Sequence, residues 1–133
     1  MVLVEWETRY SVGNEQLDQQ HQRIVAMINQ LGAAMDTGTE KPALMKILSD
    51  LAGYTKTHFA EEERLMEQHG YPELVGHCEQ HGVLNRQLAD FYRNFYISSR
   101  PQTQEVMAFL QGWLFDHILG QDKKYAPFLE NAR

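Results

Sequence analysis

The chain has 133 residues, of which 43% are hydrophobic and 23% are charged. This length and composition are typical of one globular domain and argue against a disordered chain. The formal net charge of −6 opposes binding to phosphate backbones or to anionic lipid, so nucleic acid is not an expected partner.

Cysteine usage and the N-terminal residues bear on the compartment. Cys78 is the single cysteine, so no intramolecular disulfide can form and no oxidising compartment is required. Glu5 and Glu7 lie where a signal peptide carries basic residues. The longest stretch without a charge or a histidine, residues 24–35, is shorter than the ~20 residues that cross a bilayer. We therefore expect a cytoplasmic protein without a membrane span.

The first two blocks of apolar residues have helical spacing. The first begins at Leu17, repeats in steps of four and three, and ends near residues 36–38. The second begins near Lys41 and Pro42, where a helix tolerates proline in its first turn, and ends near residues 69–70.

Two further blocks show the same periodicity. The third follows residues 71–72 and ends near residues 97–99. The fourth begins after Pro101 and continues through His117 toward Gly120, which is expected to close or distort this helix.

Short connections between consecutive helices favour antiparallel neighbours. The sequence therefore predicts an all-α fold, an up-down-up-down antiparallel four-helix bundle. Residues 1 to about 16 form an N-terminal arm that Trp6 and Tyr10 anchor on the bundle. Tyr125, Phe128 and Leu129 predict a short amphipathic helix at the C-terminal end.

Histidines on the apolar stripes are the most informative feature of the sequence. A lone histidine in such a position is more often a structural residue, but here five occupy the core-facing stripes of all four helices. They are His21, His58, His77, His81 and His117. Burying five imidazoles and the Glu62 carboxylate without a common partner would cost several kcal/mol, whereas a shared metal satisfies them together.

The spacing of these residues brings them to one level of the bundle. His58 and Glu62 are four residues apart, as are His77 and His81, so each pair projects from one helix face. Counted outward from the three turns, the candidate ligands match in depth to within one residue, about 1.5 Å of helix rise.

Asp122 is a seventh candidate ligand. It follows His117 by five residues, so it shares a face with that histidine only if the helix opens between them. Gly120 lies between the two and makes this opening plausible. The alternative is an exposed aspartate near a helix end.

Five imidazoles and two carboxylates are too many donors for one metal ion. Histidine with carboxylate suits iron or manganese, and zinc is an alternative. If both carboxylates bridge two octahedral metals and one solvent oxygen also bridges, a single coordination position stays open. An open position on a redox-active pair is a place where dioxygen can bind.

These residues resemble the hemerythrin family, in particular the bacterial hemerythrins, which are non-haem di-iron dioxygen carriers. The matching segments are Trp6, Val12-Gly13, Asp18-Gln19-Gln20-His21, His58-x-x-x-Glu62, Gly70-Tyr71-Pro72, His77-x-x-x-His81 and His117-x-x-x-x-Asp122. The resemblance covers nearly the whole chain and implies a single hemerythrin-like domain over residues 1–133.

The resemblance also implies a cofactor of two iron ions joined by an oxo or hydroxo bridge. It places His77, His81 and His117 on one iron and His21 and His58 on the other, with Glu62 and Asp122 bridging. Dioxygen is then expected to bind at the iron with two histidines. It further places an apolar pocket residue at Leu114, one turn before His117, although ordinary core packing is an equal alternative for this leucine.

The expected function is reversible dioxygen binding by a carrier or store, with an oxygen-consuming enzyme as a recipient. No catalytic base or substrate pocket is evident, so we do not expect an enzyme. Two alternatives stay open: a sensor of dioxygen or nitric oxide that acts on a partner in trans, and a di-iron enzyme of peroxide or nitric oxide chemistry. The sixth histidine, His69, is expected to be structural, and Cys78 a small packed or surface residue.

Overall fold

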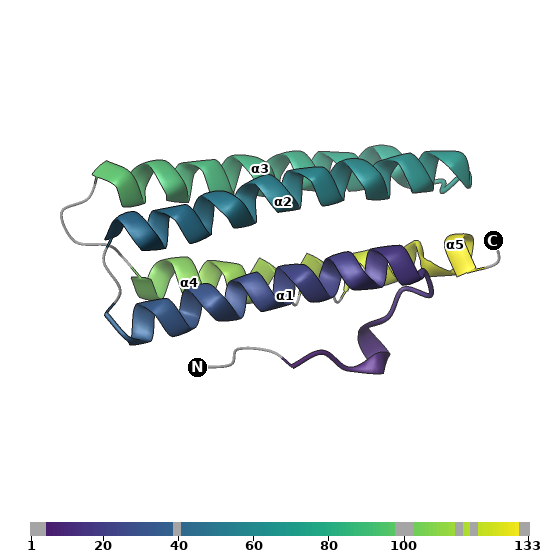
Figure 1. Ribbon diagram of the computed structural model, residues 1–133. Helices are drawn as coiled ribbons and strands as arrows, with labels where there is room; N and C mark the ends of the chain where they lie inside the picture. Colours follow the sequence, from purple (N-terminus) through teal and green to yellow (C-terminus); the bar gives the residue numbers. More distant parts are fainter. Residues whose placement is uncertain (1–4, 39–40, 98–102, 114–115, 118–119, 131–133) are drawn as a thin grey trace.

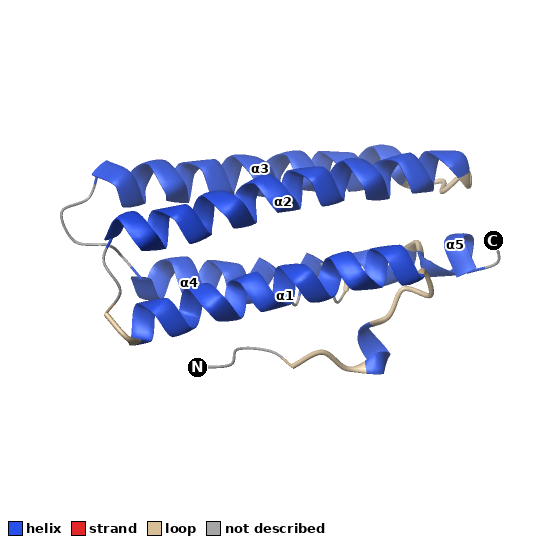
Figure 2. Cartoon of the chain, viewed as in Figure 1, coloured by secondary structure: helices blue, strands red, loops and turns tan. Residues whose placement is uncertain are grey.

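The computed structural model describes the chain except for residues 1–4, 39–40, 98–102, 114–115, 118–119 and 131–133. Its helices are α1 (Glu15–Asp36), α2 (Lys41–Gln68), α3 (Leu74–Ile97), α4 (Thr103–Trp113) and α5 (Ala126–Glu130). Two 3₁₀ turns, η1 (Thr8–Tyr10) and η3 (Gln121–Lys124), complete the regular structure. No strand occurs in the described part of the chain (Figure 2).

The four long helices run alternately up and down, with α1 packed on α2 and on α4, and α2 packed on α3 (Figure 1). The short C-terminal helix α5 lies at the same end of the bundle as the start of α1. The predicted up-down-up-down antiparallel bundle is therefore confirmed. None of the described helices combines the length and the apolar character needed to cross a membrane.

Local sequence accounts for the ends of the first helices. Asn14 caps α1 by accepting a hydrogen bond from the Leu17 backbone N–H at 3.0 Å, so the helix begins two residues before the predicted start. At the end of α2, Gly70 has a φ of +68°, and the Tyr71 N–H bonds to the Met66 carbonyl at 2.9 Å. Glycine adopts this left-handed conformation without the strain that a side chain adds, so the chain can turn sharply into α3.

The described part of the N-terminal arm, residues 5–14, lies beside the N-terminal half of α1 (Figure 1). Trp6 and Tyr10 pack against the core with their rings 5.7 Å apart, as predicted for residues that anchor the arm. The Lys123 ammonium also donates to the backbone carbonyls of Arg9, at 3.0 Å, and Ser11, at 2.5 Å. The arm is thus tied to the segment that carries Asp122.

The fourth helix is distorted in the region where the sequence predicted that Gly120 closes or distorts it. The described part of α4 reaches Trp113, Asp116 and His117 have π-helical geometry, and Gly120 precedes the 3₁₀ turn η3. A π turn takes more residues per turn than an α-helix. The described residues on either side therefore depart from a regular α-helix, and Nε2 of His117 lies 3.3 Å from Oδ1 of Asp122.

Two apolar clusters divide the interior. The larger includes Ile24, Leu51, Phe59, Leu88 and Trp113. The smaller includes Leu17, Leu65, Met66, Tyr71 and Tyr125. Along each of the four long helices and the segment after α4, the candidate ligands lie between residues of the larger cluster and residues of the smaller cluster. The ligands therefore form a polar layer that has an apolar layer on each side.

Candidate metal centre

All seven candidate ligands meet in this polar layer. His21 comes from α1, His58 and Glu62 from α2, His77 and His81 from α3, His117 from the π-helical turn, and Asp122 from η3. Each is at most 5% exposed. The structure therefore brings together every residue that the sequence singled out as a ligand.

The Glu62 carboxylate faces three imidazoles. Its Oε1 lies 3.1 Å from Nε2 of His58 and 3.5 Å from Nε2 of His81. Its Oε2 lies 3.4 Å from Nε2 of His21. One carboxylate thus reaches histidines of α1, α2 and α3.

The Asp122 carboxylate faces three imidazoles in the same way. Its Oδ1 lies 2.9 Å from Nε2 of His77 and 3.3 Å from Nε2 of His117. Its Oδ2 lies 3.1 Å from Nε2 of His21. This contact with His117 is the one that sequence reasoning made conditional on an opened helix.

These distances separate the ligands into two overlapping sets. In each set, one ligand atom from every residue lies within 4.8 Å of the others. The first set is Glu62, His77, His81, His117 and Asp122, and the second is His21, His58, Glu62 and Asp122. The geometry thus has three histidines in one set and two in the other, with both carboxylates common to them.

The Nε2 atoms of all five histidines are buried and have no hydrogen-bond partner within the described structure. Both Asp122 oxygens and Oε1 of Glu62 also lack one. A buried polar atom without a partner costs free energy, so a cluster of them requires another explanation. Divalent metal ions of the first transition row accept imidazole nitrogen and carboxylate oxygen, and they fit this donor set.

Two histidines are held from outside the layer. Nδ1 of His58 lies 2.6 Å from Oε1 of Gln20, and Nδ1 of His81 lies 3.2 Å from Oε2 of Glu63. Because these oxygens only accept, the ring protons lie on Nδ1 and leave the Nε2 lone pairs directed into the site. This arrangement is usual for histidines that bind metals.

Sequence reasoning assigned no role to Gln20 or Glu63. Each is next to a candidate ligand in the chain but supports a histidine of a different helix. Adjacency to His21 and Glu62 was the only sequence signal, and it does not indicate which ring each residue contacts.

Tyr125 closes the site on the side of the smaller cluster. Its hydroxyl donates a hydrogen bond to Oε2 of Glu62, and the side chain is fully buried. Burial, together with the Glu62 and Asp122 carboxylates, raises the pKa of Tyr125 well above 10, so the hydroxyl stays protonated and remains a donor. The sequence predicted only a packing role for this tyrosine, although its position three residues after Asp122 was a signal.

Phe59 closes the site on the side of the larger cluster. Its ring stacks on His81 with centroids 3.7 Å apart and lies 5.6 Å from the His117 ring. Trp113 packs behind it, with its ring centroid 6.2 Å from that of Phe59. Aromatic side chains therefore keep bulk water from the ligand atoms on this side.

The buried charges shift the pKa values in opposite directions. Burial alone would lower the pKa of His21, but the Asp122 and Glu62 carboxylates together raise it to about 10. Burial lowers the pKa of His81 to about 4 and also lowers that of His117. At neutral pH the metal-free site therefore holds a proton on His21, which metal ligation must displace.

Other residues weighed in the sequence lie apart from the ligand atoms or cannot be placed. His69 is half-buried beyond the end of α2 and belongs to neither ligand set. Burial and a hydrogen bond with Glu63 raise the pKa of Cys78 to about 11, so its thiol is protonated at neutral pH. Leu114, the expected pocket residue, lies outside the described residues.

Comparison with known proteins gives concordant matches. The sequence profile described as the Hemerythrin HHE cation binding domain matches residues 12–129. Proteins named Bacteriohemerythrin from Stenotrophomonas maltophilia and Pseudomonas aeruginosa (strain PAO1) are 36% and 35% identical, over 95% and 96% of this chain and 81% and 82% of theirs. A wild-type hemerythrin crystal structure superimposes with a TM-score of 0.88 at 30% identity, covering 96% of this chain and 98% of the other.

Proposed function

Because the chain belongs to the hemerythrin family, whose members bind dioxygen at a di-iron centre, we propose that it is a reversible dioxygen carrier or store rather than an enzyme. The observation that carries this proposal is the convergence of five buried Nε2 atoms on two shared carboxylates. The three-plus-two division of the histidines supports two metal ions with unequal numbers of protein ligands.

In this proposal the three-histidine set holds one iron, the two-histidine set holds the other, and the two carboxylates join them. The ligands are His77, His81 and His117 for the first iron, His21 and His58 for the second, and Glu62 and Asp122 for both. When bound, the two irons supply one electron each and an open position for dioxygen at the iron with fewer ligands. We also propose that residues 1–133 act as one hemerythrin-like domain.

The residues around the ligands support release of intact dioxygen. Neutral imidazoles outnumber carboxylates, and anionic donors are the ones that favour high oxidation states of iron. Gln20 and Glu63 fix two of the rings, so the site need not rearrange when a ligand enters. Phe59 and Tyr125 exclude water, which limits loss of the bound ligand to side reactions.

The test is a set of ultraviolet-visible spectra of the reduced, iron-loaded protein before air, after air and after degassing. A carrier develops a new absorption band in air and loses it on degassing, with about two irons per chain by elemental analysis. A band that decays with continued dioxygen consumption would instead identify an enzyme. The His69→Ala variant is the control, because this histidine is outside both ligand sets and its loss should leave the spectra unchanged.

We further propose a cytoplasmic carrier that supplies an oxygen-consuming enzyme. The single cysteine is consistent with a reducing compartment, and the reduced iron pair needs one to persist. A carrier of this kind should increase the respiration rate of cells at low dioxygen, whereas a His58→Ala variant should not.

A further inference from the structure

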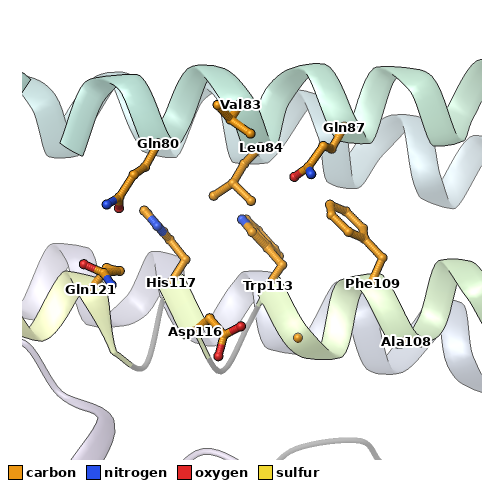
Figure 3. Close-up of a pocket in the computed structure, with 11 residues that line it drawn as sticks. Gln80, Val83, Leu84, Gln87, Ala108, Phe109, Trp113, Asp116, His117 and Gln121 are labelled. Atoms are coloured by element: carbon orange, nitrogen blue, oxygen red, sulfur yellow. The ribbon is translucent and has the colours of Figure 1, made fainter. Parts of the chain in front are cut away.

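A groove between α3 and α4 lies directly beside the candidate metal centre (Figure 3). Its volume is about 480 Å³, within the range of small-molecule sites. Leu84 of α3 faces Trp113 of α4 across it, and Val83, Phe109 and His117 also line it. The walls are therefore apolar and partly aromatic.

The polar groups of the groove restrict the charge of an occupant. Among the described residues that line the groove, Asp116 and His117 are the ionisable ones. The described lining contains no lysine or arginine, so no positively charged side chain there neutralises the Asp116 carboxylate. Nucleotides, ascorbate and other anions are thus disfavoured. Gln80, Gln87 and Gln121 supply amide donors and acceptors along the groove, which suit neutral hydroxyl or carbonyl groups.

His117 connects the groove to the metal centre. Its ring lines the groove, while its Nε2 lies 3.3 Å from Oδ1 of Asp122. Figure 3 shows Gln80 reaching from α3 toward this ring and Gln121 lying beside it. An occupant near these residues is separated from the ligand atoms by the His117 imidazole.

We propose that this groove binds a small neutral hydroquinone, which returns the oxidised iron pair to its reduced form. Its flat ring fits between the apolar walls of the groove, and its two hydroxyls match the glutamine amides. The inference rests on the proposed function, because a dioxygen carrier that oxidises to the diferric form stops working until it is reduced.

The reaction balances without another reactant. Both O–H bonds of the hydroquinone break and its two C–O bonds become carbonyls. The two electrons would reduce the two ferric ions, one each, with the His117 ring lying between the occupant and the site that would hold them. Two protons leave to solvent, which reaches the exposed lining residues Gln87 and Asp116.

Binding is tested first in metal-free protein, so that it does not depend on the iron chemistry. The chain has two tryptophans, and the Trp6→Phe variant leaves Trp113 as the only fluorophore of this type. We expect duroquinone (tetramethyl-1,4-benzoquinone) to quench Trp113 fluorescence with saturation. In this background Ala108→Phe, which fills the groove from α4, should weaken binding by about tenfold or more.

Matched variants guard against misfolding as the cause. Ala89→Phe on α3 is the same substitution at an exposed site outside the groove lining, and its binding should stay within about twofold of the parent. Val83→Phe fills the groove from the opposite wall at a position already 43% exposed, so it should repeat the effect of Ala108→Phe. Circular dichroism and iron content establish that each variant is folded.

Reduction of the iron-loaded protein is the second measurement. The rate at which duroquinol reduces the diferric protein should saturate with concentration and fall about tenfold in Ala108→Phe and Val83→Phe, but not in Ala89→Phe. Unsaturable quenching in the metal-free parent would overturn the site, whatever the iron does. Saturable binding with equal reduction rates in all variants would overturn the redox role of the groove. Absence of reversible oxygenation would refute the carrier proposal but would leave the binding result unaffected.

Discussion

Removing the hydroxyl of Tyr125 tests whether this residue holds Glu62 in position. Tyr125→Phe deletes one oxygen that donates to a fully buried carboxylate. A hydrogen bond to a charged group contributes about 1.5–3 kcal/mol. Oε2 of Glu62 is buried, so water cannot replace the hydrogen bond that it loses. We therefore expect the metal-free variant to lose about 2 kcal/mol of its free energy of unfolding.

Tyr71→Phe is the matched control. The Tyr71 side chain is also buried, at 6% exposed, but its hydroxyl donates at 3.3 Å to Glu73, whose side chain is exposed. Water can replace this bond, so the loss should be about 0.5 kcal/mol or less. Denaturation in guanidinium chloride measures both, with the slope m unchanged. Equal stability losses in the two variants would refute a special role for Tyr125.

The pH dependence gives a second signature of the same bond. The folded-state pKa of Tyr125 lies well above its ordinary value of 10, so the folded protein keeps a proton that the unfolded chain releases. The Tyr125 hydroxyl contributes fully to the free energy of unfolding below pH 10, and this contribution is lost as the pH rises toward the folded-state pKa. The stability difference between the parent and Tyr125→Phe should therefore narrow above about pH 10. A difference that widens there would contradict the assigned donor.

Three further outcomes are expected. His58→Ala should abolish the reversible oxygenated spectrum and lower the iron content, whereas His69→Ala should leave both intact; oxygenation that survives in His58→Ala would contradict the ligand assignment. Because the pKa of His21 is raised to about 10, ferrous iron must displace one proton when it binds. Anaerobic competition with a chelator should therefore show the affinity for ferrous iron rising about tenfold per pH unit above neutrality. An iron affinity that falls with pH would contradict this reasoning. Leu114→Ala should accelerate autoxidation and azide binding in stopped-flow experiments, and unchanged rates with lost stability would make Leu114 a packing residue.

Much of the fold and all seven candidate ligands could be read from the sequence, because the relevant signals are local. Apolar residues repeating at helical spacing identify a helix and the face it buries. Histidines are conspicuous on such a face, so His21 and His117 stood out without any knowledge of their neighbours. Gly70, in the turn after α2, adopts a left-handed backbone conformation. Glycine favours this conformation, so its position in the sequence indicates where the helix ends.

The tertiary structure decided how these residues meet. The division of the histidines between two sets depends on the rotation and axial shift of four helices relative to one another, and the periodicity of one helix does not specify either. The same holds for Gln20, which fixes a ring of α2 from α1, and for Glu63, which fixes a ring of α3 from α2.

Asp122 shows both contributions at one position. Its spacing from His117 is incompatible with a regular helix, so the sequence by itself determined that the chain had to open if both residues were ligands. The tertiary structure decided the form of the opening in the described residues: π-helical geometry at Asp116 and His117, the 3₁₀ turn η3, and Lys123 bonded to the N-terminal arm. Such irregular turns are held by contacts with distant segments, because local hydrogen bonding favours the regular helix.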